Sequence, residues 1–206
     1  AARATAPPRM GRVARLSAGP LTSLDAKRFP WVTEQRHPDS AEQQAAALAS
    51  ATLLATQRVQ TDRRNLAKTK QERQVADYLS GIGLTHVGPR DITTSDDAPE
   101  RGSFCGECMF GDRKADLVVR LYDGRLMPIE CKVSNSATNS VKRLNNDAAI
   151  KAEAWIKQFG TLQTVPTAVL SGVFKRHNLV QAQEAGLTIF WAHDLQPLGD
   201  FILSTR

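Results

Sequence analysis

Cysteines are few in this sequence, and long hydrophobic runs are absent. The 206 residues include three Cys, an odd number, which argues against a disulfide framework and for the reducing cytosol. No apolar run is long enough to span a membrane, and residues 1–9 lack the apolar stretch of a signal peptide. We therefore expect a cytoplasmic protein. Because the chain does not begin with Met, we also expect it to be a fragment or a processed chain.

Acidic residues are the minority among the charged ones. The 21 Asp and Glu face 27 Lys and Arg, and the pI is near 9.5, which favours a polyanionic partner over an acidic one. The length allows one good core with a small helical appendage. We predict an N-terminal arm and helical segment over residues 1–61 and a core domain over residues 62–206. The cations of the arm suit either a phosphate backbone or a soluble tail.

The strongest local signal is a β-hairpin around Asp123-Gly124, within residues 114–132. A two-residue loop would pair Leu117 with Glu130 and mix apolar and charged side chains on one face. A three-residue loop that ends on a left-handed Gly124 pairs Leu121 with Arg125 instead. This second register, which we predict, gathers one apolar face. That face consists of Leu117, Val119, Met127, Ile129, Cys131 and Val133.

The second register also places Asp116 directly opposite Glu130 on the other face, with Lys132 one step along. Two carboxylates this close repel each other unless a cation or a proton lies between them. Mg²⁺ prefers such oxygen ligands, and the carbonyl of Cys131 could add one more. A metal there could polarise a phosphodiester, with Lys132 beside the attacking water. The alternative is a surface hairpin with an ordinary ladder of ion pairs.

An acid at the start of one strand, followed by Asp/Glu-x-Lys on the next, resembles the PD-(D/E)xK nuclease superfamily. Asp116 takes the first position, and Glu130 and Lys132 take the others. The usual Pro-Asp dipeptide is Ala115-Asp116 here, which leaves the acid in place. The segment over residues 132–145 looks like that of Type II restriction endonucleases. The resemblance covers roughly residues 65–192.

This resemblance implies an α/β (α+β) fold, with a mixed central sheet flanked by helices and a nuclease core over residues 62–206. It also implies Mg²⁺-dependent, site-specific hydrolysis of double-stranded DNA, with Mn²⁺ as a possible substitute. A homodimer is expected, because palindromic sites match a two-fold axis. The alternatives are a repair or junction-resolving nuclease on the same core, and a DNA-binding module without catalysis.

Further site residues are expected around the hairpin. Glu72 falls on the same helical stripe as Val75 and Leu79, and in similar nucleases a Glu at this place reaches the metal cluster. The alternative for Glu72 is a salt bridge to Arg73 or Lys68. For DNA contact we expect a set of basic and short polar side chains, against the alternative of a solvated face. They are Arg113, Lys114, Ser134, Asn135, Ser136, Asn139, Lys142 and Arg143.

The rest of the chain predicts helices and strands that surround this hairpin. Helices are expected over about 40–60, 62–80, 140–159 and 178–185, a turn or helix over about 194–201, and strands over 84–87, 167–174 and 187–191. Residues 88–113 are expected to form a long substrate-side loop. Within that loop Cys105 and Cys108 have zinc-knuckle spacing, but no second Cys pair completes a zinc site.

Overall fold

The computed structural model describes residues 25–134 and 144–206, and the chain divides into two compact units, Ala1–Thr61 and Asp62–Arg206. The first unit contains the short helix α1 (Pro30–Thr33) and the beginning of α2 (Ser40–Gly81). At the start of α2 the Glu42 amide donates to Asp39 Oδ1 over 2.8 Å, and the Asp39 amide donates to Glu42 Oε2 over 3.0 Å. This reciprocal capping fixes where the helix begins.

One continuous helix, α2, replaces the two helices expected over 40–60 and 62–80. The expected break lay between residues 60 and 62. Nothing between Gln60 and Asp62 stops a helix, because neither Gly nor Pro occurs there. Thr61 instead donates its hydroxyl to the carbonyl of Gln57 over 2.9 Å, a bond made within a running helix.

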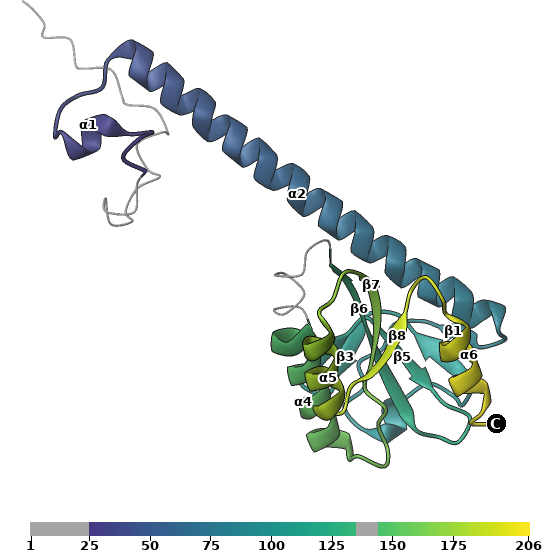
Figure 1. The fold of residues 1–206 in the computed structure, drawn as a ribbon. Helices are drawn as coiled ribbons and strands as arrows, with labels where there is room; N and C mark the ends of the chain where they lie inside the picture. The colour runs from purple at the N-terminus through teal and green to yellow at the C-terminus, as the bar shows by residue number, and fades with distance from the viewer. Residues whose placement is uncertain (1–24, 135–143) are drawn as a thin grey trace, which may run out of the picture. The chain divides into compact units, whose positions relative to one another are not determined.

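The second unit is built on a six-stranded mixed sheet in the order β1-β2-β5-β6-β7-β8 (Figure 1). The strands are β1 (Thr85–Val87), β2 (Ser103–Cys105), β5 (Leu117–Arg120), β6 (Leu126–Ser134), β7 (Thr167–Gly172) and β8 (Thr188–Trp191). Strand β5 is antiparallel to both of its neighbours, β2 and β6, whereas β6, β7 and β8 are mutually parallel. The predicted fold class, a mixed sheet flanked by helices, is confirmed.

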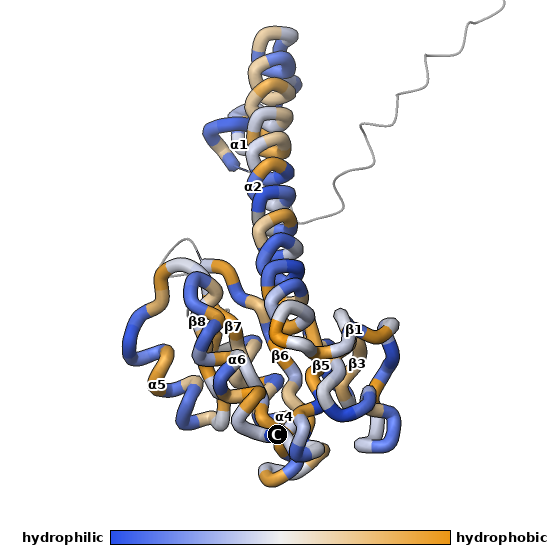
Figure 2. Tube along the Cα trace, turned by 90° about the vertical axis from the view of Figure 1, so that its right-hand side faces the viewer, coloured by the Kyte–Doolittle hydropathy of each residue, from blue (hydrophilic) through white to orange (hydrophobic). Residues whose placement is uncertain are grey.

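Helices cover both faces of this sheet (Figure 1). Residues 62–81 of α2 and α6 (Gln196–Leu203) pack on one face, through Val75, Leu79, Leu198 and Ile202. The other face is covered by the π-helical turn η4 (Leu144–Ala149), α4 (Ile150–Phe159) and α5 (Arg176–Glu184). Figure 2 shows orange, hydrophobic stretches along β5 and β6. The central strands are therefore buried on both sides, as expected when helices cover both faces.

The predicted hairpin register is confirmed. Leu117 pairs with Ile129 and Val119 with Met127, and the Leu121 amide donates to the carbonyl of Arg125 over 2.9 Å. Gly124 closes the three-residue loop with a φ of 98°, a conformation that costs glycine little. Most of the predicted apolar face lies in the core, where Leu117, Val119, Met127, Ile129 and Cys131 are all buried, whereas Val133 is half-buried.

Residues 88–113 differ from the expected long loop. They contain the 3-10 turn η3 (Ser95–Asp97), the sheet strand β2, strand β3 (Cys108–Phe110) and the start of β4 (Arg113–Ala115). β3 and β4 form a separate two-stranded sheet. Each strand is only three residues long, too short for alternation to be recognised. Burial of Phe104 and Phe110 holds these strands in place.

Gly172 is a position where a side chain is not tolerated. It pairs with Ser134 at the end of β7, has a φ of +101°, and an added Cβ would lie 2.0 Å from the carbonyl oxygen of Ser134. We expect Gly172→Ala to lower the free energy of unfolding by at least about 2 kcal/mol, through backbone strain and this clash. Equilibrium unfolding in urea measures this loss of stability. Gly88→Ala is the control, because an added Cβ there meets no atom within 4 Å; equal losses in both variants would contradict the expectation.

Within the described ranges, no helix combines the length and apolar character needed to cross a bilayer.

Candidate active site

Two buried carboxylates lie side by side at the start of β5. The Asp116 amide donates to the carbonyl of Ile129 over 3.0 Å, which continues the β5–β6 register by one residue and sets Asp116 opposite Glu130. Asp116 is 6% exposed and Glu130 is fully buried. Buried carboxylates are costly without partners, so the contacts of these four oxygens determine what the site can do.

Each of the four carboxylate oxygens faces a nitrogen donor. Asp116 Oδ2 accepts the main-chain N–H of Cys131 over 2.7 Å, and Asp116 Oδ1 lies 2.9 Å from Lys68 Nζ. Glu130 Oε1 lies 2.6 Å from Lys151 Nζ, and Oε2 lies 2.5 Å from Lys132 Nζ. Three lysines, one each from α2, β6 and α4, therefore surround two carboxylates.

Asp147 and Glu107 extend this cluster outward. Lys132 Nζ is 2.6 Å from Asp147 Oδ2, and Lys151 Nζ also donates to the main-chain carbonyl of Lys114 over 2.9 Å. Lys114 in turn pairs with Glu107 over 2.5 Å, and Glu107 lies 3.8 Å from Lys68. The ion pairs thus form two groups, one around Lys68 and one around Glu130, and the hydrogen bond from Lys151 to the Lys114 carbonyl joins them.

The electrostatics of Glu130 and Lys132 follow from burial and from each other. Burial raises the pKa of Glu130, the neighbouring charge of Asp116 raises it further, and Lys132 and Lys151 act in the opposite direction. For Lys132, burial acts to lower the pKa, but the charges of Glu130 and Asp147 outweigh it and hold the pKa above the ordinary lysine value. Lys132 is therefore a cation at neutral pH, held within reach of two carboxylates.

Glu72 lies next to Asp116 through a shared lysine. Lys68 Nζ is 3.0 Å from Glu72 Oε1 and 2.9 Å from Asp116 Oδ1. The alternative of a salt bridge to Lys68 is thus present, and a role for Glu72 at the metal stays a prediction. Burial raises the pKa of Glu72, hydrogen bonding from Lys68 lowers it, and the charge of Asp116 raises it, with a net upward shift. The pKa of Lys68 is raised, because Asp116 and Glu72 outweigh the opposing effect of burial.

Replacing Glu72 by Gln should stabilise the fold at pH 8 but not at pH 4.5. A carboxyl group whose pKa is raised on folding disfavours the folded state once the pH rises above its ordinary, unfolded value of about 4.5. We expect a gain below about 1 kcal/mol at pH 8, typical of partly exposed charges, which vanishes as the pH falls toward 4.5. Urea unfolding at both pH values measures it. Glu153→Gln, on an exposed glutamate of α4, should show no pH-dependent gain; a Glu72→Gln variant less stable at pH 8 would contradict the expectation.

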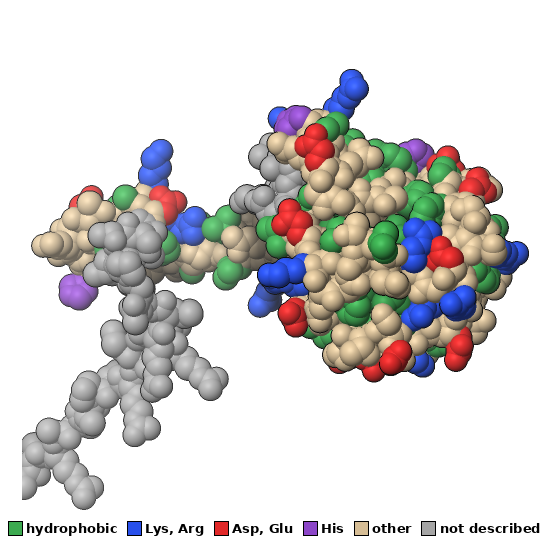
Figure 3. All heavy atoms as spheres, turned by 90° about the horizontal axis from the view of Figure 1, so that it is seen from below, with side chains coloured by type: hydrophobic (Ala, Val, Ile, Leu, Met, Phe, Trp, Pro, Cys, Tyr) green, Lys and Arg blue, Asp and Glu red, His purple; other side chains and the backbone are tan. Residues whose placement is uncertain are grey.

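The residues expected to contact DNA differ in exposure, and some of them lie outside the described residues. Arg113 and Lys114 are exposed on β4, whereas Ser134 is buried at the end of β6. Asn135, Ser136, Asn139, Lys142 and Arg143 lie outside the described residues. Figure 3 shows Lys and Arg side chains interspersed with Asp and Glu on one face of the second unit. Exposure and charge thus leave Arg113 and Lys114 as the described candidates for phosphate contact.

Lys68, Asp147 and Lys151 belong to the site although the sequence did not single them out as site residues. Lys68 and Glu72, and likewise Asp147 and Lys151, are four residues apart on a helix, the spacing of facing ion pairs. The sequence therefore contained a signal for these two ion pairs. Their meeting with Asp116 and Glu130 depends on how α2 and α4 pack on the sheet, which the spacing does not determine.

The donor set suits a hard divalent cation. Asp116 and Glu130 offer carboxylate oxygens side by side, and Mg²⁺ is commonly held by one or two carboxylates, with water and phosphate oxygens completing its shell. Among the described residues, no group of three or more His, Cys, Asp or Glu is arranged to hold a metal by itself. A cation here would therefore depend on water and substrate for its remaining ligands.

The cysteines lie apart from this donor set. The side chain of Cys131 is buried in the core, and burial raises its thiol pKa, so Cys131 contributes to the site through its main chain. Cys105 and Cys108 are buried with their sulfurs 3.9 Å apart. In the part of the chain that the structure describes, no further His, Cys, Asp or Glu completes a metal group around them.

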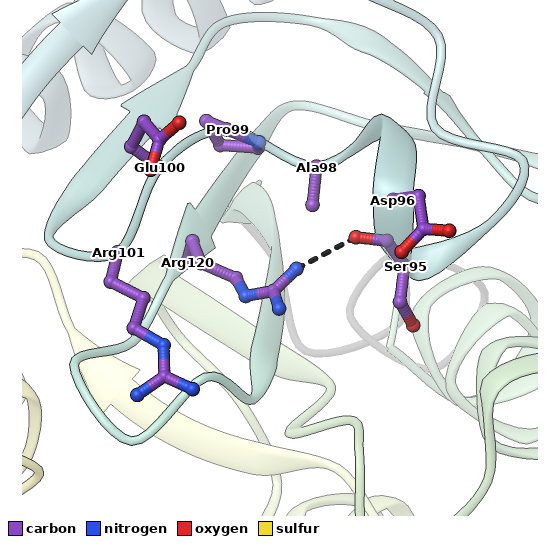
Figure 4. Close-up of a pocket in the computed structure, with 7 residues that line it drawn as sticks. All are labelled: Ser95, Asp96, Ala98, Pro99, Glu100, Arg101 and Arg120. Carbon is purple, nitrogen blue, oxygen red and sulfur yellow. Dashed lines mark hydrogen bonds between the residues drawn. The ribbon is translucent and has the colours of Figure 1, made fainter.

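A separate pocket of about 370 Å³ lies at the far end of β5 (Figure 4). It is lined by Ser95, Asp96, Ala98, Pro99, Glu100, Arg101 and Arg120. Arg120 donates to the carbonyl of Ser95 over 2.8 Å, the bond drawn dashed in Figure 4. Two arginines and two acids nearly cancel in charge, so the pocket has no clear preference for an anion or a cation.

Two comparisons with known proteins point to the same family. The family described as XamI restriction endonuclease matches residues 3–191. The Type II restriction enzyme XamI of Xanthomonas campestris pv. amaranthicola is 56% identical over 147 residues, which are 71% of this chain and 54% of that enzyme. The chain thus spans about half the length of this relative. The crystal structure of protein VC1899 from Vibrio cholerae aligns at 20% identity with a TM-score of 0.38, over 54% of this chain and 30% of that one.

Proposed function

The chain belongs to the XamI restriction endonuclease family, and from this premise we propose that it is the nuclease part of a site-specific DNA endonuclease. The substrate is double-stranded DNA and the reaction is hydrolysis of a phosphodiester bond. The observation that carries the proposal is the cluster of Asp116, Glu130 and Lys132 on two paired strands. This cluster combines two buried carboxylates with a charged lysine.

Asp116 and Glu130 are proposed to hold a Mg²⁺ ion, with Mn²⁺ as a substitute. Such an ion supplies Lewis-acid polarisation of the phosphodiester and offsets negative charge in the transition state. The Cys131 N–H donates to Asp116 Oδ2 over 2.7 Å, which restrains the orientation of this carboxylate. The carbonyl of Cys131 and the carboxylate of Glu72 are proposed as further oxygen donors at the same place.

Lys132 is proposed to act on the attacking water and the phosphate. Its ammonium is held between Glu130 and Asp147 at 2.5 and 2.6 Å, so it is charged and fixed in orientation. From there it can donate a hydrogen bond to the water or to a phosphate oxygen, where negative charge develops. Lys151 pairs with the other oxygen of Glu130, so the buried carboxylate does not depend on Lys132 alone for its compensation.

The DNA contacts and the assembly are also proposals. Exposed Arg113 and Lys114 on β4 lie next to Asp116 in sequence, where they could bind the phosphates that flank the scissile bond. Asn135, Ser136, Asn139, Lys142 and Arg143, which follow strand β6, are proposed to contribute base and phosphate contacts, whereas Ser134 is buried within β6 and is no longer proposed. A homodimer would allow two such sites to cut both strands of a palindromic sequence.

Incubation of the purified protein with plasmid DNA and Mg²⁺ tests the function directly. We expect cleavage that stops on addition of a chelator, and sequencing of the fragment ends should give one recurrent site. Random ends would indicate a nuclease without site specificity, such as a repair enzyme. Intact plasmid at every Mg²⁺ and Mn²⁺ concentration tried, with a folded protein, would contradict the proposal for this chain.

A further inference from the structure

The ammonium group of Lys68 lies near three carboxylates at once. Its ammonium lies 2.9 Å from Asp116 Oδ1, 3.0 Å from Glu72 Oε1 and 3.8 Å from Glu107 Oε2. It therefore bridges a buried acid to two more exposed ones. Such a cation can leave the buried acid and still remain paired.

Of the two oxygens of Asp116, only Oδ1 can exchange its partner readily. Oδ2 accepts the N–H of Cys131 at 2.7 Å, and this donor belongs to the β6 main chain and cannot move away. Oδ1 is covered by a flexible lysine side chain. A cation that binds Asp116 must therefore take Oδ1 from Lys68 or share it with that lysine.

The three lysines of the site differ in their freedom to move. The Lys68 side chain is 43% exposed, whereas those of Lys151 and Lys132 are 19% and 11% exposed. Lys132 and Lys151 both face Glu130, which is fully buried and has no other lysine within reach among the described residues. Removing either would leave Glu130 with less compensation, so Lys68 is the least costly of the three to displace.

We propose that Lys68 is the exchangeable counter-ion of this site, which competes with a divalent cation for Asp116 Oδ1 and moves toward Glu107 when the cation binds. No covalent change is involved, and the lysine keeps its proton throughout. Lys68 then sets the metal affinity of the protein, because each binding event requires the ammonium to leave Asp116. The inference rests on the proposed metal role of Asp116 and adds a residue that opposes metal binding.

Mn²⁺ binding in the absence of DNA, followed by electron paramagnetic resonance of the free ion, tests the proposal. Lys68→Met removes the competitor, so its affinity for Mn²⁺ should rise at least about ten-fold over the unmodified chain. Lys70→Met removes an equal charge from an exposed position on the same helix and should bind Mn²⁺ about as the unmodified chain does. Circular dichroism confirms that each variant is folded.

Lys68→Arg provides a second measurement that does not depend on the folding of the methionine variant. It keeps the positive charge, and its guanidinium can hold a carboxylate through two bonds. Mn²⁺ affinity should therefore fall several-fold. The two substitutions thus change the affinity in opposite directions, which a general effect of net charge would not produce.

Asp116→Asn separates failure of this inference from failure of the proposed function. If Asp116→Asn abolishes Mn²⁺ binding but Lys68→Met binds no more tightly than the unmodified chain, Lys68 is not a competitor and the metal site stands. The same conclusion holds if Lys70→Met tightens binding as much as Lys68→Met. If Asp116→Asn binds Mn²⁺ like the unmodified chain, the metal is elsewhere, and both proposals fail.

Discussion

Asp116→Asn is expected to lower the rate of DNA cleavage by at least about 10³-fold. The substitution removes the negative charge that Asp116 brings to the pair with Glu130, while the Asn carbonyl can still accept the N–H of Cys131. Metal-ion catalysis contributes several kcal/mol of transition-state stabilisation, and each 1.36 kcal/mol corresponds to a ten-fold change in rate. Plasmid cleavage at saturating Mg²⁺ measures the loss.

Asp112→Asn is the matched control for this prediction. Asp112 is an exposed aspartate four residues earlier, in the turn before β4, and its replacement should leave the cleavage rate within a few-fold. Binding of duplex DNA by the Asp116 variant, measured by fluorescence anisotropy, should persist, because the basic residues on β4 are unchanged. Cleavage at the unmodified rate in folded Asp116→Asn protein would exclude Asp116 from the site.

The hairpin that carries this site could be predicted from the sequence in detail. Alternating apolar residues and the Asp123-Gly124 turn act over a few residues, and they fix the β5–β6 register that the structure confirms. The strands β7 and β8 and helices α5 and α6 were likewise predicted to within a few residues, because each has its own hydrophobic period and stop signals.

The lysines around the carboxylates could not be placed in the same way. Lys68 on α2 and Lys151 on α4 reach Asp116 and Glu130 only after both helices have packed against opposite faces of the sheet. Strand β2 was missed for a related reason. Its three residues are too few for a recognisable pattern, and they form a strand because they pair with β1 and β5. Contacts that depend on packing between distant elements leave little trace in the local sequence.

Lys132→Met is expected to reduce cleavage by about 10²- to 10³-fold, the usual loss when one donor that stabilises charge in the transition state is removed, without unfolding the protein. Removing one partner of a buried ion pair is normally strongly destabilising. Here Glu130 keeps Lys151 at 2.6 Å on its other oxygen, so the buried carboxylate remains compensated. The melting temperature should consequently fall far less than the activity.

Two control variants test whether the loss of activity in Lys132→Met comes from the chemistry, from the lost charge or from unfolding. Lys175→Met removes an exposed lysine at the start of α5 and should retain the unmodified cleavage rate, which excludes a mere effect of net charge on DNA affinity. The double variant Lys132→Met/Lys151→Met should unfold at a markedly lower temperature, because Glu130 is then buried without either lysine. If Lys132→Met alone were as unstable as the double variant, its lost activity would reflect unfolding, and the assignment of Lys132 to the chemistry would lose its support.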